Sequence, residues 1–440
     1  MSRAGLLARI RGQVASRVLN AHFFSGMVDF DKHILNNGLR VLVHRDASTP
    51  LAAVNILYDV GARDEDPGRT GFAHLFEHLM FEGSMHVARF DQELQAAGGE
   101  NNAFTTNDIT NYYMSLPAQN LETAFWLESD RMLGLAFSEE KLNTQKKVVV
   151  EEYRQSYLNQ PYGDAWLLLR PLAYDRHPYR WATIGQSLDH IRDASLRDVE
   201  DFFHRFYHPG NAILVVAGNV ESEQVFRLAE KWFGDITPGE PNKRNLPREL
   251  PQQSEKRLSV QREVPQHQVY LAFHMCQRSD SLFHGSDMLS DLLANGESAR
   301  LPASLVHDKK VFSEVNAYVT GNLDPGLLII TGRPHHEVDP AAAEDMLWKE
   351  ALNLATQPVE ERELQKVKNR IEATQVFSES NVVAKSMNLA YYELQGDAGL
   401  YNRQIAAYAA VDTKDLREIA GRIFRRENAC VLHYGKGKNG

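Results

Sequence analysis

TGFAHLFEHLMFEG, residues 70–83, is the stretch that decides how the rest of this sequence folds. Its apolar residues recur at i, i+3, i+4, i+7 and i+8, the spacing of one face of an amphipathic helix; they are Phe72, Leu75, Phe76, Leu79 and Met80. Thr70 is expected to cap the amino terminus of this helix, and Gly83 to stop it. The segment is therefore predicted to lie against a core with one face and to present the other.

The other face carries His74, Glu77 and His78. Two histidines four residues apart project side by side from successive helical turns, and Glu77 lies on nearly the same face. Neutral imidazoles with a nearby carboxylate suit zinc, and the spelling H-x-x-E-H is a metallopeptidase signature. The alternative is a partly exposed helix that carries two histidines by chance. The amphipathic context favours a zinc site, at one ion per chain.

Composition excludes several other classes of protein. The 440 residues have room for about three average domains or two large ones, and a net charge of −10 argues against nucleic acid as the main partner. No apolar run approaches the roughly 18–20 residues of a membrane span, so no membrane association is expected. Cys276 and Cys430 are too few for a disulfide framework, which favours a reducing compartment.

Residues 1–27 differ in character from the rest of the chain, because they contain four arginines and no acidic residue. This character is typical of an organelle transit peptide. The alternative, which we favour, is a dispensable leader with the natural start near Met27. The expected location is accordingly the cytoplasm, or an organelle matrix if the leader is a transit peptide.

The remaining pattern predicts an α+β fold in two homologous halves. In the first half, residues 28–236, strands near 33–45, 51–61, 102–106, 110–116 and 212–218 alternate with helices. Residues 237–256 are rich in proline and charge and are predicted to form a linker. Residues 257–440 repeat the order of elements, which suggests two copies of one unit. In the second copy the corresponding helix reads SDMLSDLLANG and contains neither His nor Glu, so only one copy is expected to bind metal.

A third zinc ligand is expected from the predicted helix 138–158. Leu142, Gln145, Val149 and Glu152 fall at spacings of 3, 4 and 3, so Glu152 continues an inward stripe, whereas Glu151 is rotated by about 100° toward solvent. An inward carboxylate must be paired, protonated or bound to metal. The alternative to a ligand is a buried ion pair with an arginine such as Arg131.

These motifs resemble the pitrilysin–insulysin–mitochondrial processing peptidase family of zinc endopeptidases, in its short two-domain type. The resemblance rests on H-x-x-E-H, on Glu152 after a further 73 residues, and on the flanking text GGENNAFTTNDITNYYMSLP and FYHPGNAILVVAGNV. It covers the chain from about Val28 to its carboxyl end. It implies two α/β domains, each a mostly antiparallel sheet flanked by helices, that form half of a closed peptidase chamber.

The resemblance also implies roles for individual residues. His74, His78 and Glu152 are the expected zinc ligands, and Glu77 the general base that activates a zinc-bound water. The strand at Asn102, Ala103 and Phe104 is expected to pair with substrate backbone, although Asn102 is equally readable as a residue at the start of a strand.

Two departures from the family pattern are visible. The family carries a glutamate seven residues before the third ligand, where this chain has Gln145, an amide that adds no charge. Single-type members also carry an Arg and a Tyr in the second half, and the aligned positions here are Val306 and Ser313. Neither side chain can replace the missing donors.

The expected function is therefore a metalloendopeptidase subunit acting on small or unfolded peptides. We expect it to need a homologous partner subunit that supplies the Arg/Tyr half-site, in a heterodimer, with a homodimer as the other possibility. The alternative function is a non-catalytic core or structural subunit of the same fold. Intact His74, Glu77, His78 and Glu152 argue against that alternative, because loss of catalysis would not be expected to spare all four.

Overall fold

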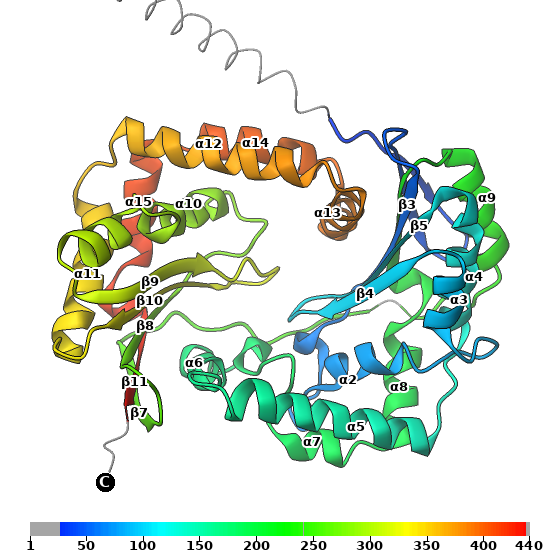
Figure 1. The fold of residues 1–440 in the computed structure, drawn as a ribbon, viewed down its shortest axis with the longest axis horizontal. Coiled ribbons are helices and arrows are strands. Elements are labelled where there is room, and N and C mark those ends of the chain that lie inside the picture. Colours follow the sequence, from blue (N-terminus) through cyan, green and yellow to red (C-terminus); the bar gives the residue numbers. More distant parts are fainter. Residues whose placement is uncertain (1–26, 241, 437–440) are drawn as a thin grey trace, which may run out of the picture.

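The computed structural model describes residues 27–240 and 242–436. The predicted leader, residues 1–27, lies outside the described residues except for Met27. Two β-sheets stand on opposite sides of the molecule, each flanked by helices (Figure 1). The predicted fold class is thus confirmed. The domain boundaries at 28–236, 237–256 and 257–440 stay a prediction.

The first sheet has six strands in the order β1-β2-β6-β3-β5-β4. Its strands are β1 (Asp31–Ile34), β2 (Arg40–Arg45), β3 (Leu51–Tyr58), β4 (Glu100–Thr105), β5 (Thr110–Pro117) and β6 (Ala212–Gly218). Only β2 and β6 run parallel, and β3 pairs antiparallel with both β5 and β6, so that Val54 lies opposite Met114 and Val216. The strand β4 is left at an edge, where its outer backbone groups have no strand partner in the described chain.

The second sheet has five strands in the order β7-β11-β8-β10-β9. They are β7 (Lys256–Arg262), β8 (Gln268–His274), β9 (Phe312–Val319), β10 (Leu327–Pro334) and β11 (Ala429–Lys436). As in the first sheet, a single pair is parallel, here β7 with β11, and the others are antiparallel. The two halves therefore share topology as well as element order, as the repeat in the sequence predicted.

Helices cover both sheets. Those of the first half are α2 (Phe72–Leu79), α3 (Phe90–Ala96), α4 (Leu121–Leu133), α5 (Glu139–Tyr153), α6 (Ala165–Ala173), α7 (Leu188–Arg192), α8 (Leu196–Phe206) and α9 (Ser222–Phe233). Those of the second half are α10 (Phe283–Ala294), α11 (Pro340–Thr356), α12 (Glu361–Ser378), α13 (Val382–Leu394), α14 (Leu400–Ala410) and α15 (Thr413–Ile423). Two π-helical turns occur, Arg154–Leu158 after α5 and Pro302–Asp308 after α10, and the first of them falls within the predicted helix 138–158.

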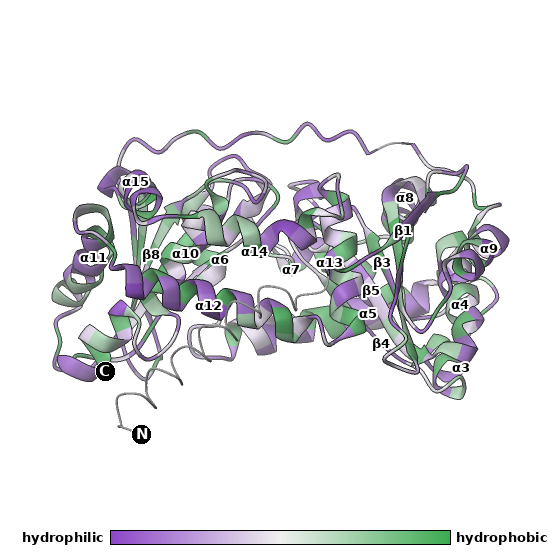
Figure 2. Ribbon diagram, turned by 90° about the horizontal axis from the view of Figure 1, so that it is seen from above, coloured by the Kyte–Doolittle hydropathy of each residue, from purple (hydrophilic) through white to green (hydrophobic). Residues whose placement is uncertain are grey.

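The halves exchange one helix each. Helix α13 of the second half packs on the first sheet, where Leu389 is buried with Leu42 and Val215. Helix α6 of the first half packs in the same way on the second sheet, with Leu169 buried against Ile329. Both helices lie between the two sheets in Figures 1 and 2. Because strand side chains alternate between the two faces of a sheet, each sheet needs a cover on both, and the other half supplies one.

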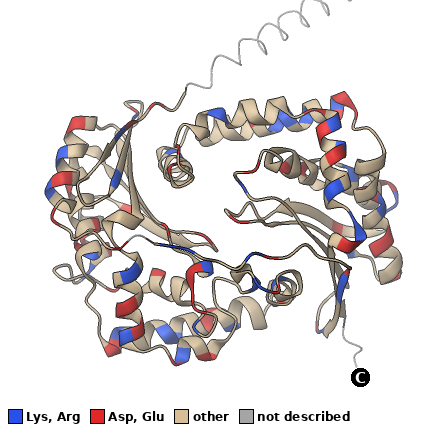
Figure 3. Cartoon of the chain, turned by 180° about the vertical axis from the view of Figure 1, so that it is seen from behind, with Lys and Arg blue, Asp and Glu red and all other residues tan. Residues whose placement is uncertain are grey.

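Charged residues of both signs are interspersed over the outer helices (Figure 3). None of the helices in residues 27–240 and 242–436 combines the length and the apolar character needed to cross a bilayer.

Candidate metal centre

Helix α2 begins one residue later than a cap at Thr70 would require. The residue before the helix is Gly71, whose φ of +89° is left-handed, and a Cβ there would lie 2.7 Å from the carbonyl oxygen of Ile184. The free backbone N–H groups are satisfied by Glu65, whose carboxyl oxygens accept from Gly71 N at 2.9 Å and from Ala73 N at 2.8 Å. Burial raises the pKa of Glu65 to about 8, against the opposing effect of these two hydrogen bonds.

The prediction of Thr70 as the N-cap was therefore wrong. Its hydroxyl lies 2.9 Å from His190 Nδ1 and accepts from Gln186 N at 2.8 Å, so it binds the later loop instead of the helix. The helix also ends at Leu79, four residues before Gly83. Glu65 can replace a local cap because the loop between it and the helix folds so that its carboxylate meets the first backbone N–H groups of the helix.

The apolar face of α2 is buried as predicted. The ring of Phe76 packs against Phe202 in α8 and against Tyr207, which directly follows α8, with centroid distances of 5.3 Å and 4.5 Å. Leu75 and Leu79 belong to the same core cluster. This packing fixes the rotation of the helix and so aims the polar face at α5.

On that polar face, His74 and His78 meet Glu152 of α5. The carboxyl oxygen Oε2 of Glu152 lies 3.1 Å from Nε2 of His74 and 3.5 Å from Nε2 of His78. The two imidazole rings are 4.9 Å apart. One carboxylate oxygen thus faces two ring nitrogens, although 73 residues separate it from the nearer histidine in the sequence.

The electrostatics of the three groups are coupled. Hydrogen bonds from His74 and then His78 hold the pKa of Glu152 well below its usual range. The same contact with Glu152 raises the pKa of His78. The alternative partner considered for Glu152 is excluded, because the Arg131 guanidinium binds Glu128 within α4. Glu151 is exposed, as its rotation on the helix predicted.

The donor set fits zinc. The ligand atoms of His74, His78 and Glu152 all lie within 4.8 Å of one another, and within residues 27–240 and 242–436 no other three His, Cys, Asp or Glu side chains are so arranged. Two imidazole nitrogens and one carboxylate oxygen are a common catalytic zinc set, which leaves a fourth position open. Their role as zinc ligands remains a prediction.

Glu77 lies beside the donor set without joining it. Its Oε2 accepts a hydrogen bond of 2.6 Å from the hydroxyl of Thr105, at the end of β4, and lies 4.0 Å from Nδ1 of His74. The other carboxyl oxygen has no hydrogen-bond partner among the described residues. Nothing in the sequence marked Thr105, because its contact with α2 depends on how the sheet edge meets the helix.

Gln145 forms a contact that the sequence did not predict. Its amide nitrogen donates to a carboxyl oxygen of Glu82, which lies just after α2. A carboxylate only accepts, so this bond fixes which end of the amide faces Glu82 and leaves the oxygen Oε1 on the other side. Gln145 is also a minor hydrogen-bonding cause of the raised pKa of His78. Glu82, which binds Gln145, therefore supplies the negative charge that Gln145 itself lacks.

The predicted substrate strand is β4. Asn102 is exposed, and its side-chain oxygen accepts from the neighbouring Ala103 N at 2.8 Å. Ala103 packs against the core cluster of α2, and Phe104 points to the opposite face, toward the cluster under α13. Because Thr105 at the end of this edge strand binds Glu77, β4 ends beside the helix that carries His74 and His78.

Val306 and Ser313, at the positions of the missing Arg/Tyr pair, make local structural contacts in the second half. Val306 sits in the second π-helical turn and packs on the core of the second half. The hydroxyl oxygen of Ser313 lies 3.0 Å from Gln266 Oε1 and 3.1 Å from the carbonyl oxygen of Arg333, so its single proton is donated to this pair of acceptors. No contact in the described chain relates either residue to the donor set.

Helix α10 is the counterpart of α2 in the second half. Gly83 and Gly296, which come after the two helices, both have a left-handed φ, of 100° and 103°. Counting back from these glycines, Asp287 and Asp291 take the places of the two histidines. Helix α10 begins three residues before the segment SDMLSDLLANG and so contains His284, whose Nε2 lies 3.1 Å from Gln404 Oε1.

Helix α12 is likewise the counterpart of α5. Leu364 and Ile371 contribute to the second core at the spacing of Leu142 and Val149 in the first. The same register places Thr374 where α5 carries Glu152. The second half therefore has no imidazole and no third carboxylate at the equivalent site.

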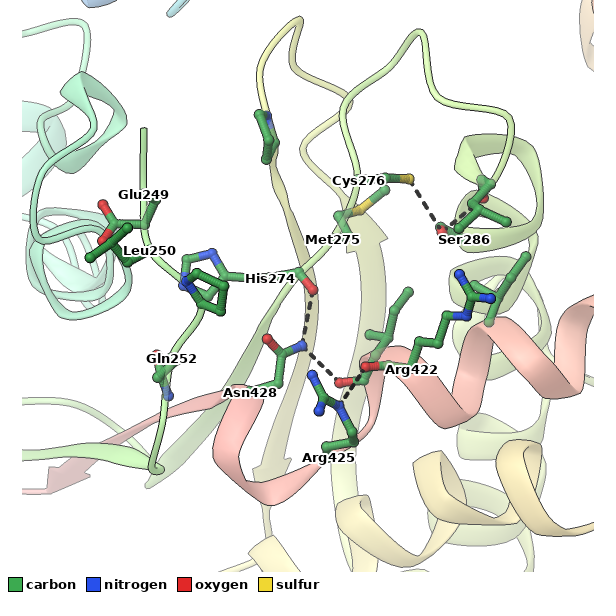
Figure 4. Close-up of a pocket in the computed structure, with 15 residues that line it drawn as sticks. Glu249, Leu250, Gln252, His274, Met275, Cys276, Ser286, Arg422, Arg425 and Asn428 are labelled. Atoms are coloured by element: carbon green, nitrogen blue, oxygen red, sulfur yellow. Dashed lines mark hydrogen bonds between the residues drawn. The ribbon is translucent and has the colours of Figure 1, made fainter. Parts of the chain in front are cut away.

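A pocket of about 290 Å³ lies elsewhere, beneath the segment that leads into β7 (Figure 4). It is bridged by Asn428, whose amide donates to the carbonyl oxygens of His274 and Ile423 at 3.0 and 2.9 Å. Cys276 lies beside it, with Sγ 3.8 Å from the hydroxyl of Ser286. None of the predicted site residues lines this pocket, so it is separate from the donor set.

Comparison with known proteins relates both halves to peptidases. Residues 40–166 match the family model described as insulinase (peptidase family M16), and residues 193–371 match the model described as peptidase M16 inactive domain. The zinc protease PqqE of Helicobacter pylori is 30% identical over 411 residues, which cover 90% of this chain and 91% of that protein.

Solved structures agree at the level of the whole chain. A protease from Helicobacter pylori superposes with a TM-score of 0.87 and 26% identity, over 92% of this chain and 99% of that one. The periplasmic protease PqqL from Escherichia coli superposes with a TM-score of 0.75 and 18% identity, over 92% of this chain but 47% of that chain, and so shares the fold across about half its length.

Proposed function

Because this chain belongs to peptidase family M16, whose members include proteins named zinc proteases, we propose that it is a zinc endopeptidase subunit. In this proposal His74, His78 and Glu152 hold one zinc ion. The observation that carries it is the convergence of their three ligand atoms within 4.8 Å, from two helices that the core aims at each other. When bound at such a site, zinc polarises a carbonyl group and lowers the pKa of a water molecule.

Glu77 is the proposed general base. Thr105 holds its Oε2 at 2.6 Å, which fixes the carboxylate plane and leaves Oε1 for the proton. Glu77 takes a proton from the attacking water and returns it to the leaving amine. Its position outside the donor set is what frees it for this transfer.

The substrate is proposed to be a small or unfolded peptide that adds as a strand to β4. An edge strand offers backbone N–H and C=O groups to an extended peptide, and Asn102, Ala103 and Phe104 line this edge. A folded protein cannot offer a free extended segment, so the edge selects for unfolded chains.

A homologous partner subunit is proposed to complete the site. Val306 and Ser313 occupy the positions of the Arg and Tyr donors and are engaged in local packing. The PqqL chain, of which this chain spans about half, is consistent with two such units working together. Losing one donor to an oxyanion costs about 10²–10³-fold in rate.

The second candidate function is a structural subunit without catalysis. The observation that favours it is the lack of an Arg/Tyr pair, together with the match of residues 193–371 to an inactive domain. The two candidates differ in measurable ways, because only the first requires a base beside a bound metal.

The test measures zinc content and cleavage of an unstructured fluorogenic peptide by the full chain. We expect about one zinc per chain and slow cleavage that a homologous chain carrying the Arg/Tyr pair accelerates, raising kcat more than it lowers KM. Zinc without any cleavage, alone or mixed, would support the structural subunit. Cleavage at ordinary enzyme rates by the chain alone would show that the homodimer is complete.

A further inference from the structure

A second pocket lies in the half without the donor set, at the place that corresponds to it. It encloses about 290 Å³ among α10, α12, α13 and α14. Its wall includes both aspartates that replace the histidines and Thr374, which replaces Glu152. The helices that build the metal centre in the first half thus build a pocket with different chemistry in the second.

The pocket brings together charges of both signs. Its lining includes two carboxylates, two guanidinium groups and three phenols, which are Asp287, Asp291, Arg278, Arg370, Tyr392, Tyr401 and Tyr408. No acid of this set lies within salt-bridge distance of either arginine, as judged over all described residues. Opposite charges that share a cavity without forming an ion pair can each bind one of the two charges of a zwitterionic ligand.

Three of the four charged groups are held by neutral side chains instead, and the Arg370 guanidinium donates to the carbonyl oxygen of Asn295. The phenol of Tyr408 donates to Asp287, and the amide of Asn295 donates to Asp291 at 2.5 Å. The Arg278 guanidinium donates to the hydroxyl of Tyr392 at 3.0 Å. These contacts orient the charged groups and leave each with hydrogen-bonding capacity toward the cavity. Burial is the main cause of the raised pKa of Asp291, and the charge of Asp287 adds to it, whereas the hydrogen bond from Asn295 and the charge of Arg370 oppose it.

An independent sign of a missing ligand is the hydroxyl of Tyr401. This side chain is 3% exposed and lines the pocket; its oxygen has no described residue in full hydrogen-bond geometry, although the nearby polar side chains of Ser378 and Asn388 lower its pKa. A buried polar group without a partner is destabilising, because it has given up its hydrogen bonds to water. A polar atom of a ligand would remove that cost.

We propose that this pocket binds a zwitterionic α-amino acid or short peptide, with its ammonium group at Asp287 and Asp291 and its carboxylate at Arg278 and Arg370. A bare cation or anion would leave the opposite pair of charges facing it unpaired. The aromatic rings and Ile371 offer an apolar surface for one side chain. A volume of about 290 Å³ is at the lower end for small-molecule sites, which suits such a ligand.

The proposal goes beyond the peptidase function and does not depend on it. The ligand belongs to the class of molecules that peptide hydrolysis yields. Its binding uses neither the donor set nor Glu77, so it is expected to persist in the zinc-free protein and in His74→Ala. Failure of the peptidase proposal would therefore leave this one standing, and the converse also holds.

The experiment is titration calorimetry on the full chain treated with a chelator. The probes are L-leucine, the dipeptide Leu-Leu and the tripeptide Leu-Leu-Leu, which separate amino acid from peptide by length. N-acetyl-L-leucine and L-leucinamide each lack one of the two charges. We expect at least one zwitterion to bind with a Kd of about 1 mM or tighter, and its singly charged analogues to bind at least about 10-fold more weakly.

Two variants locate the binding. Asp291→Asn should weaken it by about 10-fold or more, whereas Asp345→Asn, an exposed acid on α11, should leave it unchanged. Tyr401→Phe should weaken ligand binding without lowering the melting temperature of the ligand-free protein, because no described residue is in full hydrogen-bond geometry with its hydroxyl. This opposite pair of effects remains readable if Asp291→Asn fails to fold.

Three results would overturn the proposal. They are no binding by any zwitterion, equal binding by the singly charged analogues, and unchanged binding in both Asp291→Asn and Tyr401→Phe.

Discussion

Helices α2 and α10 occupy corresponding places in the two halves, and both bury an apolar face against their own sheet. On the polar face, α2 turns two imidazoles toward Glu152, whereas α10 turns Asp287 and Asp291 toward a pocket. The difference shows that packing and chemistry are carried by separate sets of residues on one helix. The buried stripe preserves the fold, so the polar face is free to change.

The largest effect is expected from removing a donor that has no counterpart in the second half. Glu152→Gln should reduce zinc from about one per chain to a small fraction, because an amide binds zinc poorly and only two imidazoles remain. Glu151→Gln is the matched control, since its side chain is exposed on the same helix. Metal analysis of the purified variants measures both. If both variants lost the same amount of zinc, Glu152 would not be the third ligand.

The next effect separates the base from the ligands. Glu77→Gln should retain zinc and lose about 10²–10⁴-fold in peptide cleavage by the fully assembled enzyme, the range for a general base. Its counterpart on α10 is Ser290, whose hydroxyl donates to the carbonyl oxygen of Asp287 at 2.8 Å, and Ser290→Ala should leave the rate unchanged. If zinc and rate fell together in Glu77→Gln, Glu77 would be a ligand.

The exchanged helices provide a comparison in stability. Leu389→Ala on α13 should lower the free energy of unfolding by about 2–5 kcal/mol, because this fully buried side chain covers the sheet of the other half. Leu352→Ala on α11, at a position 38% exposed, should change it by no more than about 0.5 kcal/mol. Chemical denaturation gives both values. Similar small changes would mean that α13 is dispensable to the first half.

The smallest effect is expected from changing Glu82, which contacts the proposed zinc ligands only through Gln145. Glu82→Gln should weaken zinc binding by about 10–100-fold, since it removes the charge that orients Gln145 next to His78. Glu93→Gln, an exposed acid on α3, is the control. Competition with a chelator measures the affinities. An unchanged affinity in Glu82→Gln would show that Gln145 needs no such support.

Much of the fold was predictable because its signals are local. The strand β6 has the predicted bounds, 212–218. The inward rotation of Glu152 could be counted along one helix. The prediction of the helix cap failed because the contacts involved are not between immediate neighbours in the sequence. Thr70 accepts a hydrogen bond from Gln186 in a later loop, and Glu65 caps the helix in its place.

The sequence by itself determined the strands and helices of both halves, the helix with two histidines and the inward rotation of Glu152. All of these derive from the periodicity of apolar residues, which burial imposes on each element separately. Tertiary structure alone decided that the halves exchange α6 and α13, that Thr105 holds Glu77 and that Glu82 orients Gln145. These contacts join side chains that are far apart in the sequence or lie on either side of a turn. Whether two such side chains meet depends on how rigid helices and strands pack, which no local sequence pattern encodes.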